Sequence, residues 1–230
     1  MSVNTLDEQL TLDEQSAREQ ICRVGRSLFE RGYVHSTAGN ISVLLADGHI
    51  IMTPTDACLG FLQPETLALL DAHGQQLSGH KASKTLSLHR AIYEADPKAR
   101  CVIHTHSTHL VQLTLQGVWS SESILPPITA YQVMKVGKVP LIAYHRPGDS
   151  AIADLLQSSI RTSMEATKPI RAAMIDRLGP NVWAANPSAA MALLEELEET
   201  AKLWVQSNPK PLPLTDTQIE ELRQGFGAIW

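Results

Sequence analysis

Two histidines separated by one residue follow the short apolar run Cys101-Val102-Ile103, and their spacing suits metal binding. Side chains on a β-strand alternate between its two faces, so His104 and His106 should point the same way, with Thr105 opposite. Two imidazoles side by side at the end of a buried strand can bind one metal ion without rearrangement of a loop. The alternative is that both are ordinary surface or hydrogen-bonded histidines. Their position directly after an apolar strand favours the metal site.

A strong metal site needs a third protein ligand, and the other histidines do not supply an obvious one. His109 is expected on the first turn of the helix that follows the strand. His89 falls in the middle of a predicted helix, where a core or surface histidine is the better interpretation. His145 precedes a turn and stays undecided. The pattern alone therefore indicates a metal site and says nothing about the substrate.

Length and composition describe an ordinary globular protein. The chain has 230 residues, of which 43% are hydrophobic and 19% charged, and its formal net charge is −5. This balance provides no basic face, which argues against nucleic acid or an anionic membrane as the main partner. No apolar run approaches the length of a membrane span.

Two further features indicate where the protein works. The N-terminal stretch MSVNTLDEQL is acidic and polar, unlike a signal peptide. Cys22, Cys58 and Cys101 are odd in number and widely spaced, so they are expected to be thiols in a reducing compartment. We therefore expect a cytoplasmic protein.

The elements that must position the histidines follow from hydrophobic periodicity and turn signals. Residues 11–32 predict a first helix, with Thr11 and Glu14 as a capping box. Besides the histidine-bearing strand, the predicted strands are 41–45, 49–53, 67–70, 75–77, 140–144 and 171–176, the first four paired as hairpins. Gly179-Pro180 is expected to break the chain after the last of them. Further helices are predicted from a cap at Ser83 to residue 95, at about 107–115, at 150–160, after Asn186-Pro187 and at 215–225.

Early hairpins with helices interspersed throughout predict an α/β fold. We expect three αβα layers, with a largely antiparallel central sheet covered by helices on both faces. One domain should span residues 1–207, and residues 208–230 should form a Pro-rich connection and a C-terminal helix. The apolar ending, with Phe226, Ile229 and Trp230, predicts packing on the same or a neighbouring subunit.

The order of several motifs resembles the class II aldolase/adducin family over roughly residues 15–205. These motifs are Ser36-Thr37-Ala38-Gly39-Asn40-Ile41-Ser42, Thr53-Pro54-Thr55, Ser83-Lys84 and His104-Thr105-His106-Ser107-Thr108-His109. Within the family, the stretches 131–138 and 144–148 are most similar to enzymes that decarboxylate sugar acids of the 3-oxo-tetronate 4-phosphate type. The resemblance implies a homotetramer with the site between neighbouring subunits.

The resemblance also implies ligands for a metal and for a phosphate. His104 and His106 would hold Zn²⁺, with Mn²⁺ as the alternative ion. The substrate's phosphate would contact Gly39, Asn40, Thr55, Ser83 and Lys84. Backbone N–H groups and hydroxyls at a glycine turn suit phosphate oxygens, and a lysine adds a cation. For Asn40 and Thr55 the alternative is ordinary turn chemistry.

Tyr131 and two departures from the family pattern bear on catalysis. Tyr131 falls where a tyrosine reaches the site, often across a subunit boundary; the alternative is a packed, half-buried side chain. Thr85 stands where the aldolases carry an acid–base glutamate, and a hydroxyl cannot replace a carboxylate in proton transfer. Leu178 occupies the place of the third histidine ligand, although Asp176 could supply an oxygen instead.

These departures favour decarboxylation over aldol cleavage. Aldol cleavage needs a base to deprotonate a hydroxyl, whereas a 3-oxo acid loses carbon dioxide with no proton to remove. The resulting enolate needs only a proton donor such as Tyr131, Lys84 or water. The sequence therefore predicts a divalent-metal-dependent carbon–carbon lyase acting on a small phosphorylated sugar acid, with Lys84, Thr85 and Tyr131 as candidate catalytic residues. The alternatives are a sugar-phosphate aldolase or epimerase, and a degenerate, non-catalytic family member that retains the scaffold.

Overall fold

The computed structural model describes residues 12–230. The polar N-terminal stretch and Thr11, the predicted capping partner of Glu14, lie outside these residues. Helix α1 (Glu14–Glu30) is capped by Asp13, whose carboxylate accepts a hydrogen bond of 2.8 Å from the backbone N–H of Ser16. This side chain satisfies one of the N–H groups that a helix N-terminus leaves without a partner.

Within residues 12–230, eight strands form one sheet in the order β4-β3-β2-β1-β5-β8-β7-β6. Neighbouring strands run antiparallel except for β6 and β7, which run parallel. The largely antiparallel sheet that the sequence predicts is thus confirmed. The strands are β1 (Asn40–Leu44), β2 (Ile50–Met52), β3 (Ala68–Leu70), β4 (Gln76–Ser78), β5 (Cys101–His104), β6 (Leu141–Ile142), β7 (Ala172–Ile175) and β8 (Gly179–Ala184).

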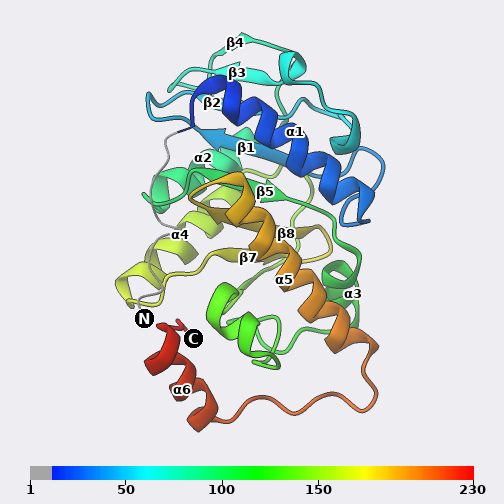
Figure 1. Cartoon of the computed structure of the whole chain (residues 1–230), viewed down its shortest axis with the longest axis vertical. Coiled ribbons are helices and arrows are strands. Elements are labelled where there is room, and N and C mark those ends of the chain that lie inside the picture. The colour runs from blue at the N-terminus through cyan, green and yellow to red at the C-terminus, as the bar shows by residue number, and fades with distance from the viewer. Residues whose placement is uncertain (1–11) are drawn as a thin grey trace.

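Helices cover both faces of the sheet and complete the three layers (Figure 1). Helices α1 and α5 (Pro187–Gln206) pack on one face, and α2 (Leu86–Ala95) and α4 (Ala151–Glu165) pack on the other. Helix α3 (Thr108–Gln116) packs against α5. Two short 3₁₀ turns, Leu59–Phe61 and Pro64–Thr66, connect β2 to β3. No helix of residues 12–230 is both long and apolar enough to cross a membrane.

Alternation along the central strands separates two hydrophobic cores. Ile41 of β1 and Ile103 of β5 belong to the core under α1 and α5, whereas Val102 belongs to the core under α2 and α4. Because side chains alternate, Asn40 and His104 fall on the face of α2 and α4. The candidate metal ligand therefore lies on a defined side of the sheet.

Strand β8 is the main departure from the predicted elements. Gly179-Pro180 predicts a break, but the strand begins there and lies between β5 and β7. Gly179 has φ 141°, and a Cβ at this position would lie 1.9 Å from the carbonyl oxygen of Thr105. Glycine thus lets β8 approach the end of β5 more closely than a side chain would allow.

The C-terminal helix α6 (Asp216–Phe226) packs on its own chain, at the opposite end of the molecule from β4 (Figure 1). It begins with a capping box between Thr215 and Gln218. Its Ile219 is buried against Val133 of a π-helix, Gln132–Val136, which the sequence did not predict. Trp230 packs against the same small core.

Candidate active site

A cavity of about 290 Å³ lies where β1 and β8 begin and β5 ends. These strand ends meet at one edge of the sheet because the strands run antiparallel. The N-terminal ends of α2 and α4 close the other sides. The cavity is lined by every predicted phosphate and metal residue and by Thr85, that is by Gly39, Asn40, Thr55, Ser83, Lys84, Thr85, His104 and His106.

Tyr131 is the one predicted site residue that the fold of a single chain does not bring to this cavity. It immediately precedes the π-helix, and 61% of it is exposed. It does not line the cavity. Its packing is also unlike the half-buried tyrosine that was the alternative interpretation.

The hydrogen bond that orients His104 comes from the neighbouring strand. Its Nδ1 lies 2.9 Å from the carbonyl oxygen of Pro180, so Nδ1 carries the proton and donates it. This fixes the tautomer and leaves Nε2 free to bind a ligand in the cavity. A carbonyl or carboxylate partner of this kind is typical of histidines that bind metals.

Both imidazoles of the pair are held in the neutral form that binds a cation. Their ring centroids lie 5.1 Å apart. The pKa of His104 is lowered to about 4, chiefly by burial and also by the neighbouring His106, against the opposing effect of the Pro180 carbonyl. The pKa of His106 is also lowered, by burial and by His35. Near neutral pH neither ring needs to lose a proton before it can bind a metal.

The cavity is also lined by hydroxyls and a cation. Thr85, rather than the predicted Ser83, is the N-cap residue of α2, and the two hydroxyl oxygens lie 3.0 Å apart. Lys84 lies between them in sequence and lines the same cavity, as do Ser87 and Leu88 in the first turn of α2. A helix N-terminus, two hydroxyls and a lysine together suit an anion such as a phosphate.

Gly39 immediately precedes β1 and lies against the end of β5, the strand that carries His104. It has φ 85°, and a Cβ there would lie 2.7 Å from the carbonyl oxygen of His104. Only a glycine allows this turn to approach the strand end so closely. The turn therefore places Asn40 directly beside His104, with which it pairs in the β1–β5 register.

The expected third ligand is not present as a histidine or a carboxylate. Leu178 lines the cavity, as its place in the family pattern predicts. Asp176 does not line it, and its carboxylate lies 3.9 Å from Nε of Arg177. No three His, Cys, Asp or Glu side chains between residues 12 and 230 are grouped to hold a metal. The prediction that Asp176 could supply an oxygen ligand was therefore wrong.

Other polar atoms beside the two histidines have no partner, and these atoms test whether a metal fits. Oδ1 of Asn40 and both side-chain polar atoms of Asn181 are buried without any hydrogen bond. Both asparagines line the cavity. Two neutral imidazoles with unsatisfied amide oxygens nearby form a donor set that a divalent cation accepts. The residues present thus fit a metal ion.

Several cavity residues were missed by sequence reasoning. Asn181 was missed because its strand was not predicted. The carboxylates Asp56 and Asp149 also line the cavity. Asp149 accepts a hydrogen bond of 3.0 Å from the N–H of Ala151 at the start of α4, which lowers its pKa. The turn motif Arg146-Pro147-Gly148-Asp149 was the signal available for it.

His89 is a core residue, one of the two interpretations its helix position allowed. It is fully buried on α2, and its Nδ1 lies 2.7 Å from the hydroxyl of Ser42. The same hydroxyl lies 2.6 Å from that of Tyr93. Burial lowers the pKa of His89 to about 3, so the ring is neutral in the fold. Its Nε2 has no partner.

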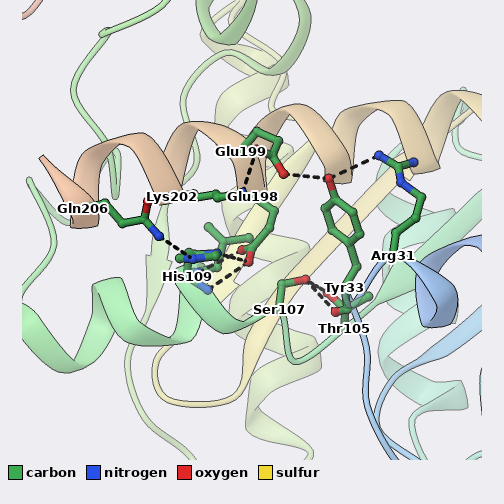
Figure 2. Close-up of polar contacts among 10 residues, drawn as sticks. Arg31, Tyr33, Thr105, Ser107, His109, Glu198, Glu199, Lys202 and Gln206 are labelled. Atoms are coloured by element: carbon green, nitrogen blue, oxygen red, sulfur yellow. Dashed lines mark hydrogen bonds and ion pairs between the residues drawn. The ribbon is translucent and has the colours of Figure 1, made fainter.

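His109 does not line the cavity and instead supports the segment that follows His106 (Figure 2). Its Nδ1 lies 2.8 Å from the buried carboxylate of Glu198 on α5. The same carboxylate accepts the backbone N–H groups of His109 and Leu110, at 2.9 and 3.0 Å. Nearby, the hydroxyl of Ser107 donates to the carbonyl of Tyr33 at 3.2 Å. These contacts fix the chain immediately after His106.

Comparison with known proteins agrees with this geometry. Residues 19–205 match the model of the class II aldolase and adducin N-terminal domain. The chain is 51% identical over 222 residues to 3-oxo-tetronate 4-phosphate decarboxylase of Cupriavidus necator, covering 94% of this chain and 99% of that protein. It is 42% identical over 212 residues to the enzyme of the same name from Escherichia coli, covering 91% and 96%.

Solved structures give the same result. The structure of YgbL from Klebsiella pneumoniae has 39% sequence identity and a TM-score of 0.84, covering 92% of this chain and 100% of that chain. An L-fuculose 1-phosphate aldolase with 21% identity shares the fold, with a TM-score of 0.76 over 95% and 99% of the two chains. The family resemblance read from the motifs is confirmed. The chain belongs to the class II aldolase and adducin family.

Proposed function

We propose that this protein is a divalent-metal-dependent carbon–carbon lyase that decarboxylates a phosphorylated 3-oxo sugar acid of the 3-oxo-tetronate 4-phosphate type. The observation that carries the proposal is one cavity lined by Lys84, by hydroxyls and by two neutral imidazoles, of which Pro180 orients that of His104. Relatives at 51% and 42% identity that bear the name of this decarboxylase support the substrate class.

The phosphate of the substrate would be held by Lys84 together with the hydroxyls of Thr55 and Ser83. These groups line the same cavity as His104 and His106, so the 3-oxo acid end of a substrate held by them would lie beside the two imidazoles. When bound there, a divalent cation supplies positive charge that stabilises the enolate left after carbon dioxide departs. We propose Zn²⁺ as this ion, with Mn²⁺ as the alternative.

The residue at position 85 fits a decarboxylation better than an aldol cleavage. The bond that breaks joins the carboxylate carbon to its neighbour, and its electron pair passes into the enolate without any proton being removed. A threonine in place of an acid–base glutamate does not hinder this step, whereas it leaves an aldol cleavage without its base. The enolate carbon then takes one proton.

We propose that Tyr131 donates this proton across a subunit boundary. The tyrosine is exposed on the surface of its own chain and lies outside that chain's cavity. In a homotetramer, it would project into the cavity of a neighbouring subunit. We further propose that the protein works in the cytoplasm, with the sugar acid as its ligand and neither nucleic acid nor membrane as a partner.

The test measures carbon dioxide release from 3-oxo-tetronate 4-phosphate by purified protein supplied with Zn²⁺ or Mn²⁺. We expect metal-dependent release that His104→Ala abolishes. A matched control is His73→Ala, because His73 is exposed in the turn between β3 and β4. Formation of an aldehyde without carbon dioxide would favour the aldolase alternative. Absence of any turnover with bound metal would favour a non-catalytic family member.

A further inference from the structure

We infer that Asn181 supplies, through its side-chain oxygen, the third protein donor to the cation held by His104 and His106. The inference rests on the metal dependence proposed above and adds a ligand to it. It assigns a function to a residue on β8 that no histidine or carboxylate pattern identifies. Three observations carry it.

The first observation is the position of Asn181 in the sheet. Across the β5–β8 ladder, Asn181 pairs directly with His104. Residues opposite each other on neighbouring antiparallel strands project from the same face, with Cβ atoms about 4.5–5.5 Å apart. Both side chains line the same cavity. The amide therefore lies on the side of the sheet where the cation would bind.

The second observation is that the amide of Asn181 is buried without partners. Asn181 is 1% exposed, and neither Oδ1 nor Nδ2 makes a hydrogen bond. Burying a polar group without a partner is unfavourable, so such groups are rare without an ion, water or functional role. A bound cation would satisfy the oxygen.

The third observation is that, within residues 12–230, no further histidine, cysteine or carboxylate is grouped with His104 and His106 to hold a metal. Leu178 cannot bind a metal, and Asp176 does not line the cavity. An amide oxygen is a harder and weaker donor than an imidazole nitrogen. A site with two histidines and one asparagine should therefore hold Zn²⁺ less tightly than a site with three histidines. It should also discriminate less strongly against Mn²⁺.

A buried water is the alternative occupant beside the same atoms. Nε2 of His89 is buried without a partner. A buried water joining His89 to Asn181 would satisfy both side chains and leave the metal site with two protein ligands. In that case Asn181 would affect metal affinity only by stabilising the fold around the two histidines. The experiment must separate these two roles.

The test is a double-mutant cycle between Asn181→Leu and Leu178→His, read by metal affinity. Leucine matches asparagine in size and removes both polar atoms, whereas histidine at position 178 offers an independent third ligand. The Zn²⁺ dissociation constant is measured by competition with a chromophoric chelator, and Co²⁺ absorption spectra report the ligand set. Circular dichroism and thermal melting check the fold, with Asn181→Ala as the second variant if Asn181→Leu does not fold.

If Asn181 is a ligand, Asn181→Leu weakens Zn²⁺ binding at least about ten-fold, since even outer-shell partners are worth ten- to a hundred-fold. In the Leu178→His background the same substitution should change affinity by no more than about two-fold, because the new histidine takes the third position. The Co²⁺ spectrum should change with Asn181→Leu. Ile152→Val, on the apolar wall of the cavity, is the control and should leave both readouts unchanged.

Two results would overturn the inference alone. Unchanged affinity in Asn181→Leu would show that the amide is not a ligand. An equal loss of Zn²⁺ affinity with and without Leu178→His would show that Asn181 affects binding only by stabilising the fold. By contrast, if the wild-type protein binds no cation more tightly than His104→Ala does, the proposed metal dependence fails as well.

Discussion

Nδ1 of His104 lies 2.9 Å from the carbonyl oxygen of Pro180, although 76 residues separate them in the sequence. A backbone carbonyl on β8 therefore sets the orientation of the side chain that ends β5. The position of β8 and the direction in which His104 presents Nε2 cannot change independently. Substitutions that displace β8 should alter metal binding even where they touch neither histidine.

Gly179→Ala should destabilise the fold and weaken metal binding. The new Cβ would lie 1.9 Å from the carbonyl oxygen of Thr105, and φ 141° strains any side chain. We expect a loss of about 3 kcal/mol or more in unfolding free energy, measured by urea denaturation. Gly225→Ala in α6 is the control, because its Cβ would meet nothing within 4 Å. It should be neutral or stabilising by about 0.5–1 kcal/mol. Equal midpoints for the two variants would contradict the packing argument.

Acid should destabilise the metal-free protein below pH 6.5. The pKa of His104 falls from 6.5 to about 4 on folding, so the unfolded chain binds the proton more readily. The contribution of His104 to the free energy of unfolding is fully present above pH 6.5 and is lost as the pH falls toward 4. The loss amounts to roughly 3 kcal/mol, at about 1.4 kcal/mol for each pH unit. Urea unfolding of the metal-free protein at several pH values measures this loss. In His104→Gln the slope between pH 6.5 and 4 should be shallower, and an unchanged slope would contradict the assignment.

Lys84→Met should raise KM for the phosphorylated substrate more than it lowers kcat. A hydrogen bond to a charged group contributes about 1.5–3 kcal/mol, which corresponds to about ten- to a hundred-fold in binding. Lys81→Met is a matched control, because Lys81 is exposed and lies outside this cavity. Steady-state kinetics of both variants give the comparison. A loss confined to kcat would place Lys84 at the reacting carbon instead of the phosphate.

Glu198→Ala should loosen the chain that follows His106. The carboxylate is 5% exposed and accepts both N–H donors of His109 and that of Leu110. Its removal leaves buried donors unsatisfied, and we expect a loss of about 3–5 kcal/mol in unfolding free energy. Glu199→Ala, which removes a hydrogen bond from Tyr33 and an ion pair with Lys202 at a half-exposed site, should cost much less. Similar losses in the two variants would argue against a special role for Glu198.

Tyr131→Phe and His104→Ala should complement each other if the tyrosine acts across a subunit boundary. Each variant alone should be nearly inactive, because one lacks the proton donor and the other a metal ligand. Unfolding and refolding the two together forms mixed oligomers, in which a wild-type cavity can receive a wild-type tyrosine. Carbon dioxide release by the mixture measures the recovery. No recovery in verified mixed oligomers would place the tyrosine's role elsewhere.

Local signals were sufficient to predict most elements. Asp47-Gly48 gave the β1–β2 hairpin, and Asn186 caps α5 with Pro187 at its first turn. The histidine pair was located because alternation along a strand follows from sequence spacing alone. The residues expected to bind phosphate were predicted from motif order, and each of them lines the cavity.

The features that the sequence did not predict depend on contacts with distant parts of the chain. Gly179-Pro180 has the local character of a break, yet pairing with β5 and β7 makes it the start of a central strand. Missing that strand concealed Asn181. The π-helix after Tyr131 is stabilised by α6, which lies more than 80 residues later. No local pattern carries such information.

The separation between His104 and Pro180 also has a consequence for synthesis. A ribosome releases β1, β5 and both imidazoles well before it makes β8, which brings the orienting carbonyl and the amide of Asn181. An ion that meets the nascent chain finds two untethered rings and no enclosed space. If the histidine pair binds a metal as proposed, we expect stable binding only after nearly the whole polypeptide has emerged and the middle of the sheet has closed.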